Sequence, residues 1–306
     1  MRFSLFAIIA IAIIVTGVVI ERTPFAAPLA VQSSLPHAAS VARAEVFGPR
    51  VKNDLPFPGI TARSAAVVDG ATGVLLGEKN KDAVQTIASI TKLMTALVFL
   101  DTHPVWQTAV TMERKDNRPG GALFVFPGER LTVYDLFMTA LVGSANNAAV
   151  ALARVTGFAP DVFVERMNDR AMVMGLAATH FVEPTGLDSG NVSSALDLVR
   201  LGWYAFREPS LREALTAKEH LFFTTNTERR HRVKTTNDLL FAETDGYALV
   251  GAKTGFTDEA GYTFVVSALH EGHDVIVALL GAPTEDDRFG DADVLIRWAF
   301  EKYAWE

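Results

Sequence analysis

The stretch ASITKLMTALVFLD, residues 88–101, combines a serine, a lysine three positions later and a nearly unbroken apolar run. A helix would place Ser89 and Lys92 on one face, because residues at i and i+3 are neighbours on a helix surface. Ser89 lies near the expected N-terminus of this helix, where free N–H groups and the helix dipole favour a developing negative charge. The residues after Lys92 are apolar almost all round the helix, which predicts a central, buried position.

A buried amine beside a hydroxyl has a definite chemistry. Apolar surroundings remove the hydration of Lys92 and thereby lower its pKa. A neutral amine can then act as the general base for a nucleophilic serine, here Ser89. The pair alone is weak support, because 12 Ser and 9 Lys residues in 306 positions give about 0.35 Ser-x-x-Lys pairs by chance.

The sequence outside this helix predicts strands toward both ends of the chain and helices between them. Apolar runs around the turn GATG indicate a hairpin whose first strand is 64–69. A sheet built from both chain ends with a helical insert forms two lobes, and we expect a site in the cleft between them. Further strands are expected at 250–255, 262–269 and 275–280, and further helices at 131–142, 146–155, 161–174, 194–206 and 286–303. Helix caps are expected at Thr132 or just before it, and at Ser193 or Ser194.

Composition excludes several classes of function. Hydrophobic residues make up 49% of the chain, which is enough for a sizeable core. The net charge of −7 argues against a nucleic-acid partner, because phosphate binding requires clustered Lys and Arg. The short basic cluster ERRHR, at 228–232, is interpreted as a solvated loop or strand edge. Cysteine is absent, which excludes thiol catalysis, Cys-ligated zinc and disulfide bonds.

The N-terminus predicts export. Residues 3–20 carry no charge and are about long enough to span a bilayer core as a helix. We interpret this segment, with residues 1–20, as an uncleaved membrane anchor; the alternative is a signal segment cleaved after ARA at 42–44. Residues 21–60 are rich in Ala, Pro and Ser and are expected to form a flexible tether. Residues 61–306 are then the exported domain.

Two later stretches carry polar residues that suit a serine nucleophile. GSANNAAVALA places Ser144 and Asn146 on a short turn before a helix, where a hydroxyl could relay a proton and an amide could hold a substrate carbonyl. GAKTGFTDEAGYTF places Lys253, Thr254 and Gly255 on a predicted strand. Lys253 would hold positive charge that helps keep Lys92 neutral, and Thr254 could bind a carboxylate. The glycine leaves room for another backbone to approach.

Ser-x-x-Lys, Ser-x-Asn and Lys-Thr-Gly, in this order, resemble the motifs of the penicillin-recognising serine enzymes, and most closely those of the D-alanyl-D-alanine carboxypeptidases. The resemblance covers residues 64–303. It implies a β-lactamase/transpeptidase-like α/β (α+β) fold, in which both chain ends build one antiparallel sheet and a helical subdomain is inserted. Beyond the motifs, it extends to VVDGATGVLLGEKN, IASITKLMTAL, MNDRAMVMGLAATHFVEPTGLD, TTNDLL and LLGAPTEDDRFGDADVLIRWAFEKY.

The resemblance also implies a role for each residue of the first two motifs. Ser89 would be the acylated nucleophile and Lys92 its base. Ser144 would pass the proton to the leaving D-alanine, and Asn146 would orient the peptide. The substrate would be the D-Ala-D-Ala end of a peptidoglycan stem peptide, hydrolysed through an acyl-enzyme without a metal or an organic cofactor. A β-lactam would acylate the same serine.

The C-terminal strands complete the implied site. Lys253 and Thr254, followed by Gly255, would bind the terminal carboxylate. The N–H groups of the nucleophile and of Phe256 would form the oxyanion hole. Arg288, in the segment DDRF, either assists carboxylate binding or forms a surface ion pair.

Alternative functions with the same residues stay open. A D-alanyl-D-alanine endopeptidase would cut peptide cross-links, and Ala145 and Asn147 flank the second motif differently from its commonest form, which leaves this choice undecided. A β-lactamase and a non-catalytic wall-binding protein are more distant alternatives. Many relatives carry a second, β-rich domain and a C-terminal anchor. Because the closing helix is the last element expected here, we expect residues 3–20 to attach an extracytoplasmic enzyme to the cytoplasmic membrane.

Three features imitate functional motifs and are interpreted as structural. Ser-Gly-Asn at 189–191 also spells Ser-x-Asn, but it lies in a Gly- and Asp-rich loop. His270 and His273 belong to a tight turn, which does not aim both rings at one metal ion. Glu183, in FVEPTGLD, lacks the Glu-x-x-Leu-Asn pattern of the deacylating glutamate in class A β-lactamases.

Overall fold

The computed structural model describes residues 48–118, 120–121, 123–244 and 246–305. The described residues all belong to one compact unit. Within these residues no helix is both long and apolar enough to cross a bilayer. The anchor predicted at 3–20 lies outside them.

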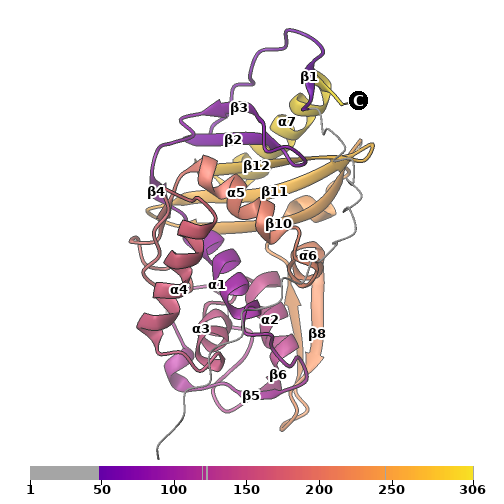
Figure 1. Ribbon diagram of the computed structural model, residues 1–306. Helices are drawn as coiled ribbons and strands as arrows, with labels where there is room; N and C mark the ends of the chain where they lie inside the picture. Colours follow the sequence, from indigo (N-terminus) through magenta and orange to yellow (C-terminus); the bar gives the residue numbers. More distant parts are fainter. Residues whose placement is uncertain (1–47, 119, 122, 245, 306) are drawn as a thin grey trace, which may run out of the picture. The chain divides into compact units, whose positions relative to one another are not determined.

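A five-stranded antiparallel sheet joins the two ends of the sequence (Figure 1). Its strand order is β10-β11-β12-β2-β3, so the N-terminal hairpin lies beside the C-terminal strands. Val277, for example, pairs with Val67 across β12 and β2. The predicted fold class is therefore confirmed. The strands are β2 Ser64–Asp69, β3 Leu75–Lys79, β10 Ala248–Thr257, β11 Gly261–His270 and β12 His273–Ala282.

Alternating side chains divide this sheet between two cores. Ala66 of β2 belongs to the core on the helical side, whereas the next residue, Val67, belongs to the core beside the closing helix α7, Glu285–Lys302. Helix α5, Ala195–Ala205, covers the first face and α7 the second (Figure 1). Because both faces are buried, the central strands are continuous apolar runs rather than alternating ones.

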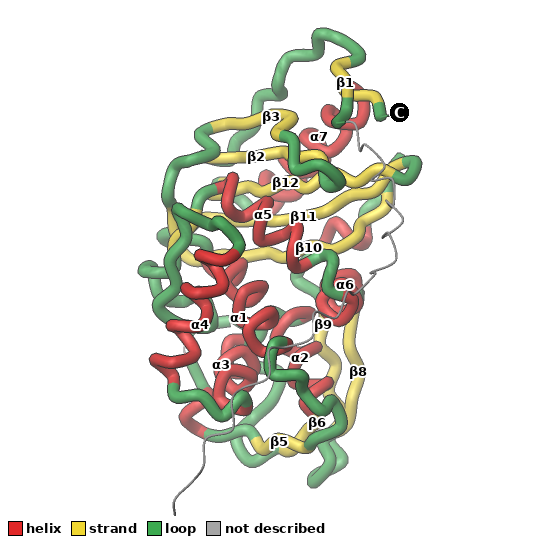
Figure 2. Tube along the Cα trace, in the orientation of Figure 1, coloured by secondary structure: helices red, strands yellow, loops and turns green. Residues whose placement is uncertain are grey.

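The inserted helical region packs around α1, Thr91–Leu100 (Figure 2). Residues 91–99 are all buried, as the apolar run predicts. The side chains of Thr132 and Ser194 each accept the backbone N–H three residues later, so both predicted caps are confirmed. The other helices of this region are α2 Val133–Val142, α3 Asn146–Val155, α4 Pro160–Val173 and α6 Pro209–Thr216.

A second hairpin was not predicted, and it contains the basic cluster ERRHR. It consists of β8, Glu219–Phe223, and β9, Arg230–Lys234. In β9 His231 and Val233 are buried while the basic residues that alternate with them, Arg230, Arg232 and Lys234, are exposed, which agrees with a solvated strand edge. Short strand pairs complete the described unit: β1 Arg50–Val51 with β13 Tyr303–Ala304, β4 Gln85–Thr86 with β7 Val192–Ser193, and β5 Ala109–Thr111 with β6 Arg130–Thr132.

Contacts with the folded unit begin earlier than residue 61, where the tether was expected to end. Strand β1 pairs with β13. The Phe57 ring meets the Trp298 ring edge-on, with 5.2 Å between centroids. Residues 50–57 therefore pack on the closing helix, because an aromatic side chain in the Pro-rich stretch finds an apolar partner there.

Candidate active site

Ser89 lies in a single 3₁₀ turn, Ala88–Ile90, that leads directly into α1. Ala88 has a left-handed backbone, with φ 48°. This conformation costs a non-glycine residue free energy and recurs at functional sites. Lys92 Nζ lies 2.8 Å from Ser89 Oγ, so the two side chains meet as their spacing predicts.

Lys92 is buried, with 1% of its surface exposed. Its Nζ lies 2.7 Å from Asn146 Oδ1 and 2.7 Å from the carbonyl oxygen of Thr185. These oxygens can only accept, so a neutral amine donates both hydrogens to them and presents its lone pair to the Ser89 hydroxyl. Burial lowers the pKa of Lys92 to about 7, although the charge of Glu183 acts in the opposite direction. The surroundings therefore fit the unprotonated amine predicted from the sequence.

The turn before α3 aims two side chains at different lysines. Ser144 has a left-handed backbone, with φ 53°, and its Oγ accepts from Lys253 Nζ at 2.8 Å. Asn146, the first residue of α3, directs Oδ1 to Lys92 and donates from Nδ2 to the carbonyl of Gly120 at 2.9 Å. One turn thus connects both lysines.

Lys253, on β10, is as deeply buried as Lys92, with 1% exposed. Its Nζ donates to Ser144 Oγ and to the carbonyl oxygen of Thr254, each at 2.8 Å. Burial, and then the positive charges of Lys92 and Arg288, lower the pKa of Lys253 well below its usual value. Desolvation therefore opposes the positive charge that the sequence analysis expects at Lys253, and its hydrogen bonds to two oxygens favour that charge.

Strand β10 is one of the two outer strands of the sheet, and its Gly255 lies beside the nucleophile turn. A Cβ on Gly255 would lie 2.9 Å from the backbone nitrogen of Ser89 and 2.4 Å from Thr263 Oγ1, so a larger residue does not fit. Phe256 follows, half-exposed, with its ring centroid 4.4 Å from that of Tyr262. An outer strand leaves backbone groups free to bind an extended peptide.

Thr254 and Arg288 occupy one end of the cleft. Thr254 Oγ1 shares a 2.5 Å hydrogen bond with Thr236 Oγ1. Arg288 reaches in from α7 and is 2% exposed, so it is no surface residue. It donates to the carbonyl of Gly255 at 3.3 Å and also pairs with Glu285. Burial lowers the pKa of Arg288, and the charge of Glu285 acts in the opposite direction.

The cleft has a volume of about 530 Å³ and brings the predicted residues together. Nine site residues were predicted from the sequence. Seven of them line the cleft, and the other two, the buried Lys92 and Lys253, complete the site. The seven are Ser89, Ser144, Asn146, Thr254, Gly255, Phe256 and Arg288. Gly186 and Leu187 also line the cleft, and their segment EPTGLD could have indicated them. Thr236 could have been found in the same way from TTNDLL. Phe124 comes from a loop without a sequence signal.

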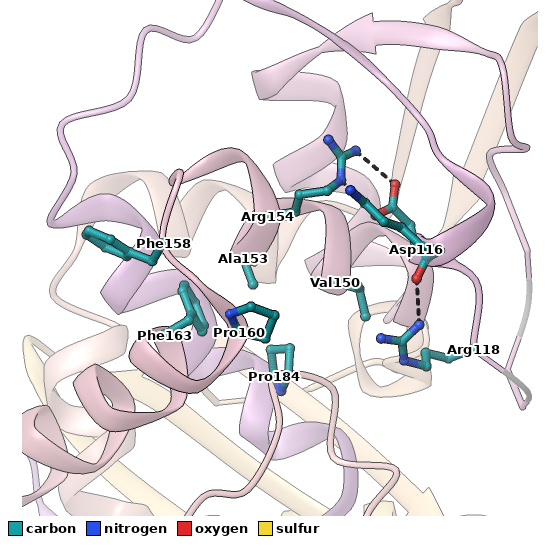
Figure 3. Close-up of a pocket in the computed structure, with 10 residues that line it drawn as sticks. Asp116, Arg118, Val150, Ala153, Arg154, Phe158, Pro160, Phe163 and Pro184 are labelled. Carbon is teal, nitrogen blue, oxygen red and sulfur yellow. Dashed lines mark hydrogen bonds and ion pairs between the residues drawn. The ribbon is translucent and has the colours of Figure 1, made fainter.

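A separate cavity of about 370 Å³ lies between α3 and α4 (Figure 3). Phe163 and other apolar side chains line it, while Arg154 is paired with the buried Asp116 at 2.8 Å. It contains none of the predicted site residues. Pro184 forms part of its wall, so this cavity borders the loop that supplies the Thr185 carbonyl.

The three features that resemble functional motifs but were interpreted as structural lie outside the cleft. Asn191 is fully buried in the loop network. His270 and His273 pair across the β11–β12 turn and contact Phe300 and Trp305, respectively. Within the described part of the chain, no group of three or more His, Cys, Asp or Glu residues could hold a metal ion.

An antiparallel sheet from both chain ends, an inserted helical region and a Ser-Lys pair at their junction define the class of β-lactamase- and DD-peptidase-like serine enzymes. Comparison with known proteins specifies the family. The family model described as D-alanyl-D-alanine carboxypeptidase matches residues 51–284, so the chain belongs to this family.

Individual relatives agree with this assignment. The chain is 35% identical over 262 residues to a D-alanyl-D-alanine endopeptidase of Pseudomonas aeruginosa, covering 85% of this chain and 84% of that protein. It is 30% identical over 250 residues to the D-alanyl-D-alanine carboxypeptidase DacF of Bacillus subtilis, covering 79% of this chain and 63% of DacF. The crystal structure of a D-alanyl-D-alanine carboxypeptidase from Mycobacterium tuberculosis matches with a TM-score of 0.74 at 28% identity, covering 82% and 96% of the two chains.

Proposed function

We propose that the chain is a serine D-alanyl-D-alanine carboxypeptidase that removes the terminal D-alanine from peptidoglycan stem peptides. One observation carries this proposal: the buried Lys92 amine is held by two carbonyl oxygens and lies 2.8 Å from the Ser89 hydroxyl. A neutral amine in this position activates a serine without a histidine. Membership of the family supports the substrate class.

Acylation follows from the neutral state of Lys92. Its Nζ takes the proton of Ser89 as Oγ bonds to the carbonyl carbon of the penultimate D-alanine. The N–H groups of Ser89 and Phe256 stabilise the negative charge on the carbonyl oxygen. The proton then passes through the Ser144 hydroxyl to the leaving nitrogen, the C–N bond breaks and D-alanine departs, while Asn146 orients the peptide.

Deacylation and inhibition use the same groups. Water attacks the ester carbonyl as the Lys92 amine takes one of its protons. The bond between the carbonyl carbon and Ser89 Oγ then breaks, Lys92 returns the proton to Oγ, and the shortened peptide leaves as a carboxylic acid. A β-lactam ring acylates the same oxygen, but its leaving nitrogen stays attached and hinders the attack of water. We therefore expect penicillin to form a long-lived adduct.

The cationic end of the cleft fits a terminal carboxylate. Lys253, Thr254 and Arg288 line or underlie this end, and the charges acting on Lys253 are themselves positive. A substrate carboxylate supplies the negative charge that Lys253 lacks, through charge-assisted hydrogen bonds.

The peptidoglycan substrate of the family places the domain outside the cytoplasm. Residues 3–20 would anchor the chain to the cytoplasmic membrane and the segment after residue 20 would form the tether. The catalytic domain would follow and extend to residue 306. Cleavage after residue 44 would instead release the enzyme, and the mass of the mature chain distinguishes the two.

A D-alanyl-D-alanine endopeptidase is the second candidate. The observation in its favour is sequence identity: the chain is 35% identical to the Pseudomonas endopeptidase but 30% identical to the carboxypeptidase DacF. The same nucleophile and base would cut a cross-link, in which the leaving group is larger than D-alanine.

Intact-protein mass spectrometry of the full-length chain with penicillin tests the proposal, with Ser89→Ala in parallel. We expect a gain of one penicillin mass that the variant loses. No adduct with intact drug would favour a wall-binding protein, and no adduct with hydrolysed drug would favour a β-lactamase. D-Alanine release from a pentapeptide, compared with cleavage of a cross-linked dimer, then separates carboxypeptidase from endopeptidase.

A further inference from the structure

The loop 183–187 touches both members of the Ser-Lys pair. The carbonyl oxygen of Thr185 lies 2.7 Å from Lys92 Nζ. Gly186 has φ 87°, and a Cβ there would lie 1.8 Å from the carbonyl oxygen of Ala88, so the loop rests directly on the nucleophile turn. Displacement of this loop would remove one of the acceptors that hold the lysine.

The carboxylate of Glu183 organises this loop. Its Oε2 accepts from the backbone N–H of Thr185 at 2.8 Å and from the hydroxyl of the same residue at 2.6 Å. Its Oε1 accepts from the N–H groups of Gly186 and Leu187. Both oxygens therefore bind the loop itself, which agrees with the structural interpretation of Glu183 and leaves neither directed at Ser89.

Asn191 connects this carboxylate to helix α1. Its Nδ2 donates to Glu183 Oε1 at 2.9 Å and lies 3.2 Å from Thr91 Oγ1, one residue before Lys92. The asparagine of the rejected Ser-x-Asn sequence thus belongs to a buried network behind the base.

We infer that Glu183 is a positioning residue for Lys92, which fixes the Thr185 carbonyl and directs a negative charge toward the amine without contacting substrate. This inference rests on the proposed role of Lys92 as the base. Glu183 is the carboxylate that acts on Lys92 and raises its pKa, while Lys253 from β10 is a like charge and Asn146 from α3 is neutral. Without Glu183, burial would lower the pKa of Lys92 further.

The substitution Glu183→Gln distinguishes a role of Glu183 in positioning Lys92 from a purely structural role. We expect the acid limb of the rate of penicillin acylation to move to lower pH, by about half a unit or more, because the opposite charge is gone. The rate above pH 8 should fall about tenfold or more, because the amine is less well placed. Glu183→Asp keeps the charge with a shorter reach, so it should lower the rate above pH 8 but retain the acid limb. This second variant also serves if the first fails to fold.

Asp188→Asn is the matched control. This exposed carboxylate belongs to the same stretch and accepts from the N–H of Gly190, so its removal should leave the acid limb unchanged. An equal shift in this variant would contradict a specific role for Glu183.

Carbon-13 NMR of labelled lysine side chains provides a readout that needs no activity. The Lys92 resonance, assigned with Lys92→Arg, should titrate at lower pH in Glu183→Gln than in the parent protein. An unchanged titration and an unchanged acid limb would overturn the inference. If the parent protein forms no penicillin adduct, the proposed function fails, while the NMR titration still tests Glu183.

Discussion

The two lysines of the cleft are equally buried but differently surrounded. Lys92 has three oxygens around its amine, and the carboxylate of Glu183 acts on it. Lys253 has two oxygens, and positive charge on Lys92 or Arg288 lowers its pKa further. The same residue type at the same depth is thus prepared for two tasks. In the proposed mechanism Lys92 is the neutral base, and Lys253 lacks a counter-charge that an anionic substrate can bring.

This difference couples the two lysines through the substrate. A carboxylate beside Lys253 favours its charged form, because an opposite charge raises the pKa of an amine. Charged Lys253 in turn disfavours protonation of Lys92, since two buried like charges repel. Binding of the correct substrate would therefore prepare the base. We therefore propose that the positive charge expected at Lys253 helps keep Lys92 neutral once a substrate carboxylate is bound.

Among the changes that distinguish the two lysines, substitution of Lys92, the proposed base, should lower the reaction rate most. Lys92→Met keeps the apolar stem but removes the proton acceptor, so penicillin acylation of Ser89 should slow by about 10²- to 10⁴-fold. Time-resolved mass spectrometry measures this rate. Lys115→Met, which alters an exposed lysine, is the matched control and should acylate normally. A Lys92→Met rate within threefold of the parent rate would assign the base to another group.

The pH dependence should show which lysine titrates as the base. In the proposed mechanism Lys92 acts in its unprotonated form, and burial lowers its pKa to about 7. Activity should therefore rise with pH, about tenfold per unit below pH 7, and level off above it. Steady-state kcat/KM between pH 5 and 9 checks this. A rate that falls from pH 6 to pH 8 would mean that a protonated group is required instead.

Local patterns in the sequence predicted the elements that carry the site, because each motif sits on a strongly patterned segment. The apolar run after Lys92 predicted α1, and the caps marked the starts of α2 and α5. The left-handed backbones at Ala88 and Ser144 could not be predicted, since tertiary contacts impose them on ordinary residues. The Thr185 carbonyl lies 93 positions from Lys92 in sequence, a distance at which no periodicity carries information.

Substitution of the second lysine should have a smaller and more selective effect. Lys253→Met should lower kcat/KM about 10- to 100-fold for a peptide with a free C-terminal carboxylate, the loss expected for one charged hydrogen bond. The same peptide with a C-terminal amide should lose less, because it has no charge for Lys253 to bind. Steady-state kinetics on both peptides gives the ratio. Equal losses would show that Lys253 acts through Ser144 or through packing rather than through the carboxylate.

The smallest expected effect is on the pH dependence of the free energy of unfolding. This measurement distinguishes the two lysines in the absence of substrate. Because burial lowers the pKa of Lys92 to about 7, the folded protein loses this proton as pH rises above 7, while the unfolded chain keeps it up to about pH 10.5. This lysine should therefore add up to about 1.4 kcal/mol to the free energy of unfolding for each unit that pH rises from 7 to 9. Lys253 should also raise the free energy of unfolding as pH rises. For this residue the rise should begin at a pH well below its usual pKa of 10.5.

Urea unfolding at several pH values measures these slopes, with Lys92→Met and Lys253→Met beside the parent. Lys92→Met should flatten the rise between pH 7 and 9, because methionine binds no proton in either state. An unchanged slope in Lys92→Met would mean that Lys92 stays charged in the folded protein. In that case its three oxygen partners stabilise an ammonium ion, and the contrast between the two lysines would be one of hydrogen bonding rather than of charge.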